Sequence, residues 1–383
     1  MPFLGKSRTL FKIFGVPVKI DLSWFLILGL IVWTLAAHWL PSQLGGSWVQ
    51  YVLWALAGAL AFFASLLAHE LCHSLVAKAT GMPVGGITLF IFGGVSELEE
   101  EPPTAPAEFF MAVVGPASSV LIGVCIFLAW LFAPESWPRP LVAMLQWLWI
   151  VNFILAAFNS IPAFPLDGGR VLRSFLWGIT EDINKATRIS ATVGSGFGIM
   201  LLVLGVFSAL NGLIIQGLWA IFVGLFLRQA AMGALQQLIM RQQLEGEPIR
   251  RFMTPEPVTV TPGLRLREFV DDYVLNYHFT YFPVVDEMGK LIGIVHARDP
   301  KEIHQRDWEE ATVGDVMNEV HDQMLLHPGV DAVEALSRLR GEETRRLIVV
   351  DEEQRPIGVL SLRDLMDFLA LKIDLSPRQI SRR

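Results

Sequence analysis

The chain has 383 residues, of which 53% are hydrophobic and only 17% are charged, a composition far from that of typical soluble proteins. Its formal net charge of −7 and the lack of an evident basic face exclude nucleic acid as an expected partner. Its two cysteines, Cys72 and Cys125, lie in apolar stretches and indicate no disulfide framework. Long apolar runs end near residue 240, so we expect a transmembrane domain over 1–240 and a soluble domain over 241–383.

Six apolar segments are long enough to cross about 30 Å of hydrocarbon at about 1.5 Å per helical residue. They lie at about 22–40, 49–78, 107–133, 141–178, 189–210 and 213–240. Lys and Arg gather before the first segment, near Lys78, between Arg170 and Arg188 and after Arg228, whereas the opposite loops hold a single Arg139. The positive-inside rule therefore predicts a multi-pass protein of the cell membrane with both termini and the soluble domain in the cytoplasm.

Residues 84–95 are β-branched, aromatic and flanked by glycines, which predicts a strand or hairpin at the cytoplasmic face. Its edge could bind an extended substrate peptide, or the hairpin could be purely structural. The acidic run that follows, Glu97 to Glu101, is expected to be an exposed loop.

The sequence HELCH in the second apolar segment places His69 and His73 one helical turn apart on the same face. Two imidazoles at this spacing can bind one Zn²⁺, and Glu70 is then placed to take a proton from the attacking water. An ionisable Glu within a membrane segment is costly, so a functional role is the default interpretation.

A catalytic zinc normally has three protein ligands, and Asp167 is the best candidate for the third. It lies where Pro162, Pro165 and two glycines break the fourth apolar segment. Non-helical backbone at membrane depth is tolerated only where protein buries it or it lines a cavity. Alternatively, Asp167 merely caps the helix that follows.

These residues resemble the site-2 protease family of intramembrane metalloproteases, whose patterns H-E-x-x-H and N-x-x-P-x-x-P-x-D-G are both met. The resemblance implies a membrane all-α fold with six transmembrane helices and a small β element near the active site. It also implies one zinc ion per chain, held by His69, His73 and Asp167, with Glu70 as the base. Asn159 would hold the substrate or the oxyanion, although its amide could equally bond backbone groups freed near Pro162.

The expected activity is hydrolysis of peptide bonds in or near transmembrane segments of membrane-anchored proteins, as in regulated intramembrane proteolysis. The main alternative is a membrane transporter or channel gated by its soluble domain, since intramembrane acids and broken helices also mark ion paths. Paired histidines beside a base, and six segments without repeated halves, argue against that alternative.

The soluble domain contains an internal repeat, because residues 281–299 align with residues 346–364. The pair resembles tandem cystathionine-beta-synthase (CBS) domains, an α+β fold, over about 249–301 and 311–372. The resemblance implies ATP or AMP as a possible ligand and a possible homodimer through the pair. Ser361 and Asp364 fit the nucleotide motif, whereas the first copy has Asp299 but His296 in place of the hydroxyl. Both acids can equally be read as helix caps.

Overall fold

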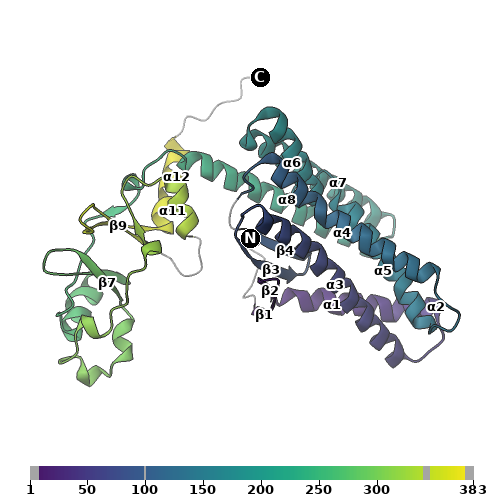
Figure 1. The fold of residues 1–383 in the computed structure, drawn as a ribbon, viewed down its shortest axis with the longest axis horizontal. Coiled ribbons are helices and arrows are strands. Elements are labelled where there is room, and N and C mark those ends of the chain that lie inside the picture. Colours follow the sequence, from purple (N-terminus) through teal and green to yellow (C-terminus); the bar gives the residue numbers. More distant parts are fainter. Residues whose placement is uncertain (1–7, 99–100, 340–345, 376–383) are drawn as a thin grey trace. The chain divides into compact units, whose positions relative to one another are not determined.

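The computed structural model describes residues 8–98, 101–339 and 346–375. The chain divides into two compact units, Met1–Leu238 and Ile239–Arg383, which we describe separately. Figure 1 shows the first as a bundle of long helices beside a small sheet and the second as short strands with short helices.

Within the described residues, six helical stretches are long and apolar enough to cross a membrane. The first is composed of α1 (Ser23–Thr34), a π-helical turn (Leu35–Trp39) and α2 (Leu40–Gln43). The others are α3 (Trp48–Ala79), α4 (Ala105–Leu131), α5 (Arg139–Asn159), α7 (Ile183–Leu210) and α8 (Ile214–Leu244).

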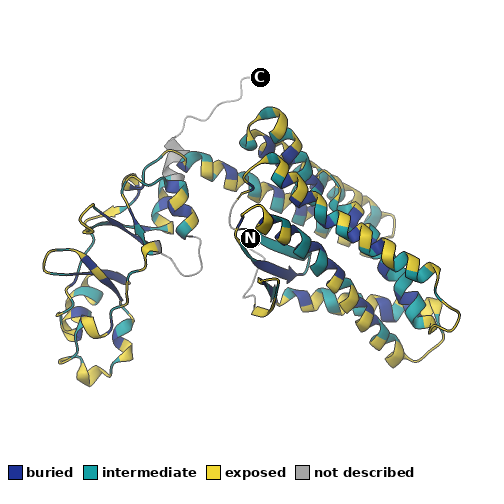
Figure 2. Ribbon diagram, in the orientation of Figure 1, coloured by how far each residue is buried: buried dark blue, intermediate teal, exposed yellow. Residues whose placement is uncertain are grey.

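The outer surface of the helical bundle is apolar. Figure 2 shows exposed residues along its outward helix faces, and large hydrophobic side chains are among them. Leu26 is 68% exposed and Phe207 is 65% exposed. Such exposure would be unfavourable in water and is appropriate for side chains that face lipid.

The predicted break in the fourth apolar segment is present. Helix α5 ends at Asn159, residues 160–166 form a loop, and α6 (Asp167–Thr180) starts directly after it. Glycines allow this loop to pack closely on the helices, since a Cβ on Gly168 would overlap the carbonyls of Ser160 and Ile161. A Cβ on Gly194 of α7 would likewise overlap the backbone of Phe164.

The predicted hairpin is part of a larger sheet than the sequence indicated. Strands β3 (Val84–Phe90) and β4 (Gly93–Leu98) pair antiparallel, as expected, and β1 (Arg8–Ile13) and β2 (Val16–Ile20) extend the sheet in the order β1-β2-β3-β4. Strand β2 pairs with β3 in parallel, so the sheet joins the start of the chain to the hairpin.

One residue of the acidic run does not lie in a loop. Glu97 belongs to β4, where it forms an ion pair with Lys19 of β2 at 2.8 Å and accepts a hydrogen bond from Thr88. Placed near two cross-strand partners, its carboxylate stabilises the sheet. Glu99 and Glu100 lie outside the described residues.

Helices α7 and α8 are packed with their backbones in contact. A Cβ on Gly205 would lie 2.7 Å from the carbonyl oxygen of Gly217, and one on Gly198 would lie 2.8 Å from that of Gly224. Small residues at such crossings allow close approach of helices in lipid, where packing rather than water exclusion drives association.

The second unit contains two copies of one α+β module. Strands β6 (Tyr281–Val285) and β7 (Leu291–His296) form one hairpin, and β9 (Arg346–Val350) and β10 (Pro356–Ser361) form the matching one. Two short strands, β5 (Thr254–Pro255) and β8 (Leu325–Leu326), complete the second sheet. The α-helices of the second unit after α8 are α9 (Leu266–Glu268), α10 (Leu275–Tyr277), α11 (Ala332–Leu339) and α12 (Leu362–Leu375).

Candidate metal centre

Helix α3 carries the HELCH residues. Its start is fixed by a capping box between Ser47 and Gln50, and its length of 32 residues gives an uninterrupted helix through the apolar run. His69, Glu70 and His73 are all buried, although all three can carry charge. Burial of three such side chains in an apolar bundle requires specific partners.

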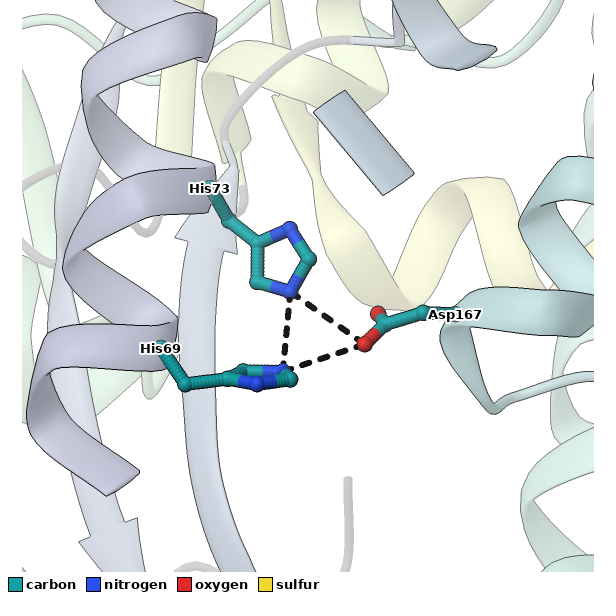
Figure 3. A group of neighbouring side chains, drawn as sticks. All are labelled: His69, His73 and Asp167. Carbon is teal, nitrogen blue, oxygen red and sulfur yellow. Dashed lines mark hydrogen bonds and ion pairs between the residues drawn. The ribbon is translucent and has the colours of Figure 1, made fainter. Parts of the chain in front are cut away.

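Asp167 meets the two histidines from the opposite side (Figure 3). Its Oδ2 lies 3.1 Å from His69 Nε2 and 3.3 Å from His73 Nε2, and the two Nε2 atoms are 3.1 Å apart. Asp167 is the first residue of α6, and the partners of its side chain among the described residues are His69 and His73. The loop therefore presents this carboxylate to the histidines and not to the helix terminus.

The three donor atoms have the spacing that one zinc ion requires. Ligands at about 2.0–2.1 Å in tetrahedral geometry lie roughly 3.3 Å from one another, close to the three distances given above. Space beside them depends on Gly115 of α4, because a Cβ there would overlap His73 Nε2 and lie 2.7 Å from His69 Nε2. The donor set and its surroundings thus fit a zinc ion.

Helix α4 orients both imidazole rings. His69 Nδ1 lies 2.9 Å from the hydroxyl of Ser119, and His73 Nδ1 lies 2.6 Å from the carbonyl oxygen of Met111. A carbonyl can only accept, so Nδ1 of His73 is the donor, and in a neutral imidazole this leaves the lone pair of Nε2 facing Asp167 and His69. Such outer partners fix ring orientation and tautomer in metal sites.

Glu70 lies against the hairpin. Its Oε2 accepts a hydrogen bond from Ser96 of β4 at 2.9 Å, and Gly94 provides room for its side chain, since a Cβ there would lie 3.1 Å from Glu70 Cδ. The same hairpin is held at its turn by α8, where Phe92 stacks on Phe226 with 3.7 Å between ring centroids. The Glu70 carboxylate therefore lies between its own helix and β4, and α8 packs on the turn of the same hairpin.

The sequence did not indicate Ser96, Ser119 or the Met111 carbonyl as parts of the site. Gly115 precedes a proline in the sequence, but its contact with the rings depends on how α3 and α4 pack. Asn159 is half-buried, and its amide nitrogen donates to the carbonyl oxygen of Leu155 in its own helix at 3.1 Å. The amide therefore bonds a backbone carbonyl, but this carbonyl belongs to α5 and is not one of the groups freed near Pro162.

The candidate nucleotide residues of the second unit already have hydrogen-bond partners. Asp364 Oδ2 accepts from the backbone amide and the hydroxyl of Ser361 at 2.8 and 2.6 Å. Asp299 Oδ2 accepts from the backbone amide of His296 at 2.7 Å and from the amide of Asn318 at 3.1 Å. Both acids thus make the local hydrogen bonds expected of caps.

Comparison with known proteins agrees with both halves of the molecule. Residues 57–137 and 133–203 match the model of peptidase family M50, and residues 249–300 and 313–371 match that of the CBS domain. A zinc metalloprotease of Methanocaldococcus jannaschii is 30% identical over 378 residues, which are 97% of this chain and 99% of the relative. The chain belongs to peptidase family M50.

Two further similarities are to a protein sequence and to a solved structure. A Synechocystis protein provisionally named as a zinc metalloprotease is 33% identical over 371 residues, which are 96% of each chain. The solved site-2 protease from Methanocaldococcus jannaschii is 30% identical and covers 60% of this chain and 95% of its own, with a TM-score of 0.44.

Membership in M50 makes this chain a zinc metalloendopeptidase of the site-2 protease type with C-terminal CBS domains. Members of the family are integral membrane proteins that act on membrane-anchored substrates within the bilayer, which agrees with the apolar helices of the first unit. The expected fold and enzyme class are confirmed, and the transporter or channel alternative is not.

Proposed function

We propose that this M50 protease cleaves membrane-anchored proteins in regulated intramembrane proteolysis, with one zinc ion per chain held by His69, His73 and Asp167. The observation that carries the proposal is the convergence of these three donor atoms beside the buried Glu70. The ligands come from α3 and from the start of α6, so the site is shared by two helices of the transmembrane domain, for which we propose the range 1–240.

When bound, zinc would polarise the scissile carbonyl and activate water for attack. Glu70 takes the proton of the attacking water and returns it to the leaving amine, while Ser96 holds the carboxylate by donating to its Oε2. A scissile bond inside a helix is screened by its own hydrogen bonds, so the substrate must unwind locally. The free edge of β4, the last strand of the sheet, is suited to bind the extended segment, and Asn159 is the candidate group for holding it.

The decisive test replaces Glu70 by Gln in the full chain. Glu70→Gln keeps the size of the side chain and removes its basicity, so the purified variant should retain zinc while losing cleavage of a co-expressed membrane substrate. Zinc content by atomic absorption and cleavage by immunoblot are the measurements. Full cleavage by Glu70→Gln would end the proposal, and trapped substrates on this variant would identify the targets.

For the CBS pair, over about residues 241–383, we propose modulation by an adenine nucleotide, with Ser361, Asp364 and Asp299 as candidate contacts. The half-buried positions of these side chains support access, and the bonds of Asp299 to His296 and Asn318 are exposed. Calorimetric titration of the purified full chain with ATP and AMP is the test. If both titrations are flat, a scaffold or homodimer contact is the remaining role for the pair.

We further propose that both termini and the CBS pair lie in the cytoplasm. The support is the distribution of Lys and Arg among the loops between the spans, together with the even number of candidate spans in the described residues. The catalytic water would then enter from the cytoplasmic side.

A further inference from the structure

A second charged cluster lies inside the first unit and has no part in the chemistry described above. Glu108 of α4 is 0% exposed and Arg173 of α6 is 8% exposed. Arg173 Nε donates to Glu108 Oε1 at 2.6 Å, a second guanidinium nitrogen contacts the same oxygen, and a third lies 3.5 Å from the hydroxyl of Thr187 in α7. The pair therefore ties three helices together.

A buried ion pair is weak evidence for a purely stabilising role. The cost of removing both charges from water is comparable with their attraction, and an apolar pair of similar volume often serves the fold as well. Ionisable residues within transmembrane segments are rare and are functional by default, and Glu108 lies in α4, one of the candidate spans. The position of this pair relative to the metal centre indicates what it does.

On one side, the pair belongs to the helix that orients the histidines. Glu108 lies one turn before Met111, whose carbonyl meets His73, and the same helix continues through Gly115 to Ser119, which meets His69. The helix that orients both imidazole rings is therefore also the support to which Arg173 of α6 is anchored.

On the other side, the pair holds the segment that presents Asp167. Arg173 lies on the helix that Asp167 begins, and its guanidinium carbon lies 5.7 Å from the ring centre of Phe164, three residues before Asp167. The backbone of Phe164 is also packed on Gly169 and Gly194, where a Cβ would overlap it. Arg173 thus contacts both the histidine-orienting helix and the loop that leads to the third donor.

We propose that Glu108 and Arg173 are positioning residues that set Asp167 against His69 and His73. The inference rests on the proposed zinc site and extends it to two residues that touch neither substrate nor metal. It differs from a simple structural role in one respect, because a positioning pair acts through Asp167 whereas a structural pair would act on the whole bundle.

The test measures zinc affinity of the full chain in detergent by competition with chelators of graded strength. Arg173→Met and Glu108→Gln are each made with Asp167 present and with Asp167→Asn. With Asp167 present, each change should weaken zinc binding by roughly tenfold or more, the usual effect of losing an outer partner of a metal ligand. With Asp167→Asn, the same changes should have no further effect on the two-histidine site.

Two controls keep the result interpretable. Arg188→Met removes an exposed arginine next to Thr187 and should leave zinc affinity unchanged. Arg173→Lys keeps the charge without the planar fork and should recover part of the affinity, and it replaces Arg173→Met if that variant does not fold.

Each outcome decides between the proposals. An equal loss of affinity in both backgrounds would show a structural role and overturn the positioning proposal, as would no loss in either. If Asp167→Asn weakens zinc binding while the Glu108 and Arg173 variants do not, the zinc site stands and only the positioning role fails. If the unmodified chain binds no zinc, both proposals fail.

Discussion

Gly115 leaves room for the two imidazole rings where any larger residue would fill it. The Cβ of an alanine would overlap His73 Nε2 and lie 2.7 Å from His69 Nε2, so one of the rings would have to leave its position. Gly115→Ala should therefore weaken zinc binding by roughly tenfold or more, as expected when ligand orientation is lost.

The control for that prediction is Gly29→Ala in α1, where an added Cβ meets no atom within 4 Å. Zinc content and chelator competition on both purified variants are the measurements. Equal zinc affinity of Gly115→Ala and Gly29→Ala would contradict the close approach of α4 to the histidines.

Tyr281 in β6 offers a test of pH dependence in the second unit. Its side chain is 6% exposed, and its hydroxyl has no hydrogen-bond partner within the described residues. Burial raises the pKa of the Tyr281 phenol above its ordinary value, against a smaller opposing effect of Arg346. Below about pH 10, the pKa of Tyr281 in the unfolded chain, the phenol is neutral in both states and does not make stability depend on pH. Above that pH the unfolded chain ionises first, so the free energy of unfolding falls as pH rises toward the folded-state pKa.

Tyr281→Phe should therefore stabilise the second unit by about 1 kcal/mol at neutral pH, since an unpaired buried hydroxyl is removed. It should also reduce the loss of stability above about pH 10. Thermal unfolding of the full chain at neutral and alkaline pH checks both effects. A lower stability of Tyr281→Phe at neutral pH would show that the hydroxyl has a partner.

At the same scale, sequence reasoning found the residues whose spacing is local. His69 and His73 lie one turn apart on any helix, and Asp167 stands out as an acid at a Pro and Gly break, so their meeting could be predicted. Ser96 and Ser119 reach Glu70 and His69 across 26 and 50 residues of chain. No local pattern specifies such contacts, because they depend on which helix faces pack together.

Among the helices, the crossing of α7 and α8 is the contact most sensitive to side-chain size. Gly205→Ala would place a Cβ 2.7 Å from the carbonyl oxygen of Gly217, so the helices must separate. Overpacking of this kind typically costs about 1–3 kcal/mol. The variant should unfold at a lower temperature than the unmodified chain.

Gly196→Ala in the same helix is the matched control, because an added Cβ there has no atom within 4 Å. It changes helix propensity by the same amount without affecting the crossing. If both variants unfold at the same temperature, the backbones of α7 and α8 are not in contact.

The elements also show where sequence reasoning was incomplete. Hydropathy predicted the long helices and the break before Asp167 because lipid demands internally satisfied backbone over about 20 residues. The strands β1 and β2 were missed, since their basic residues suggested a flank of the first span. The available signal was a glycine between two short stretches that alternate polar and apolar residues, which is typical of a hairpin. In the structure, Phe14 and Gly15 form its turn, both at positive φ.

At the scale of the whole molecule, the orientation in the membrane is open to a direct test. Glu135 follows α4 and Glu353 lies in the turn between β9 and β10, and both are exposed. In a background without Cys72 and Cys125, a cysteine at 135 should react with an impermeant maleimide applied to intact cells. A cysteine at 353 should react only after permeabilisation, and the reverse pattern would invert the proposed topology.

The two units have separate cores, which agrees with the change of composition near residue 240. In the second unit, the internal repeat was visible because residues 281–299 align with residues 346–364, and the first strand of each hairpin is buried over almost its whole length. What alignment of the copies could not show is that they interlock, since Thr254 pairs with Val359 and Asn318 pairs with Ile294.

The parallel pairing of β2 with β3 sets an order of assembly during synthesis. An isolated two-stranded hairpin such as β1 with β2 is marginal alone, and its partner strand emerges only after α1 and α3 have been made. We therefore expect residues 8–20 to lack their partner strand until two membrane helices have inserted. The sheet beside Glu70 can then form before Asp167 is translated. The Asp167 carboxylate would therefore reach a site in which α3, with both histidines, and the sheet are already in place.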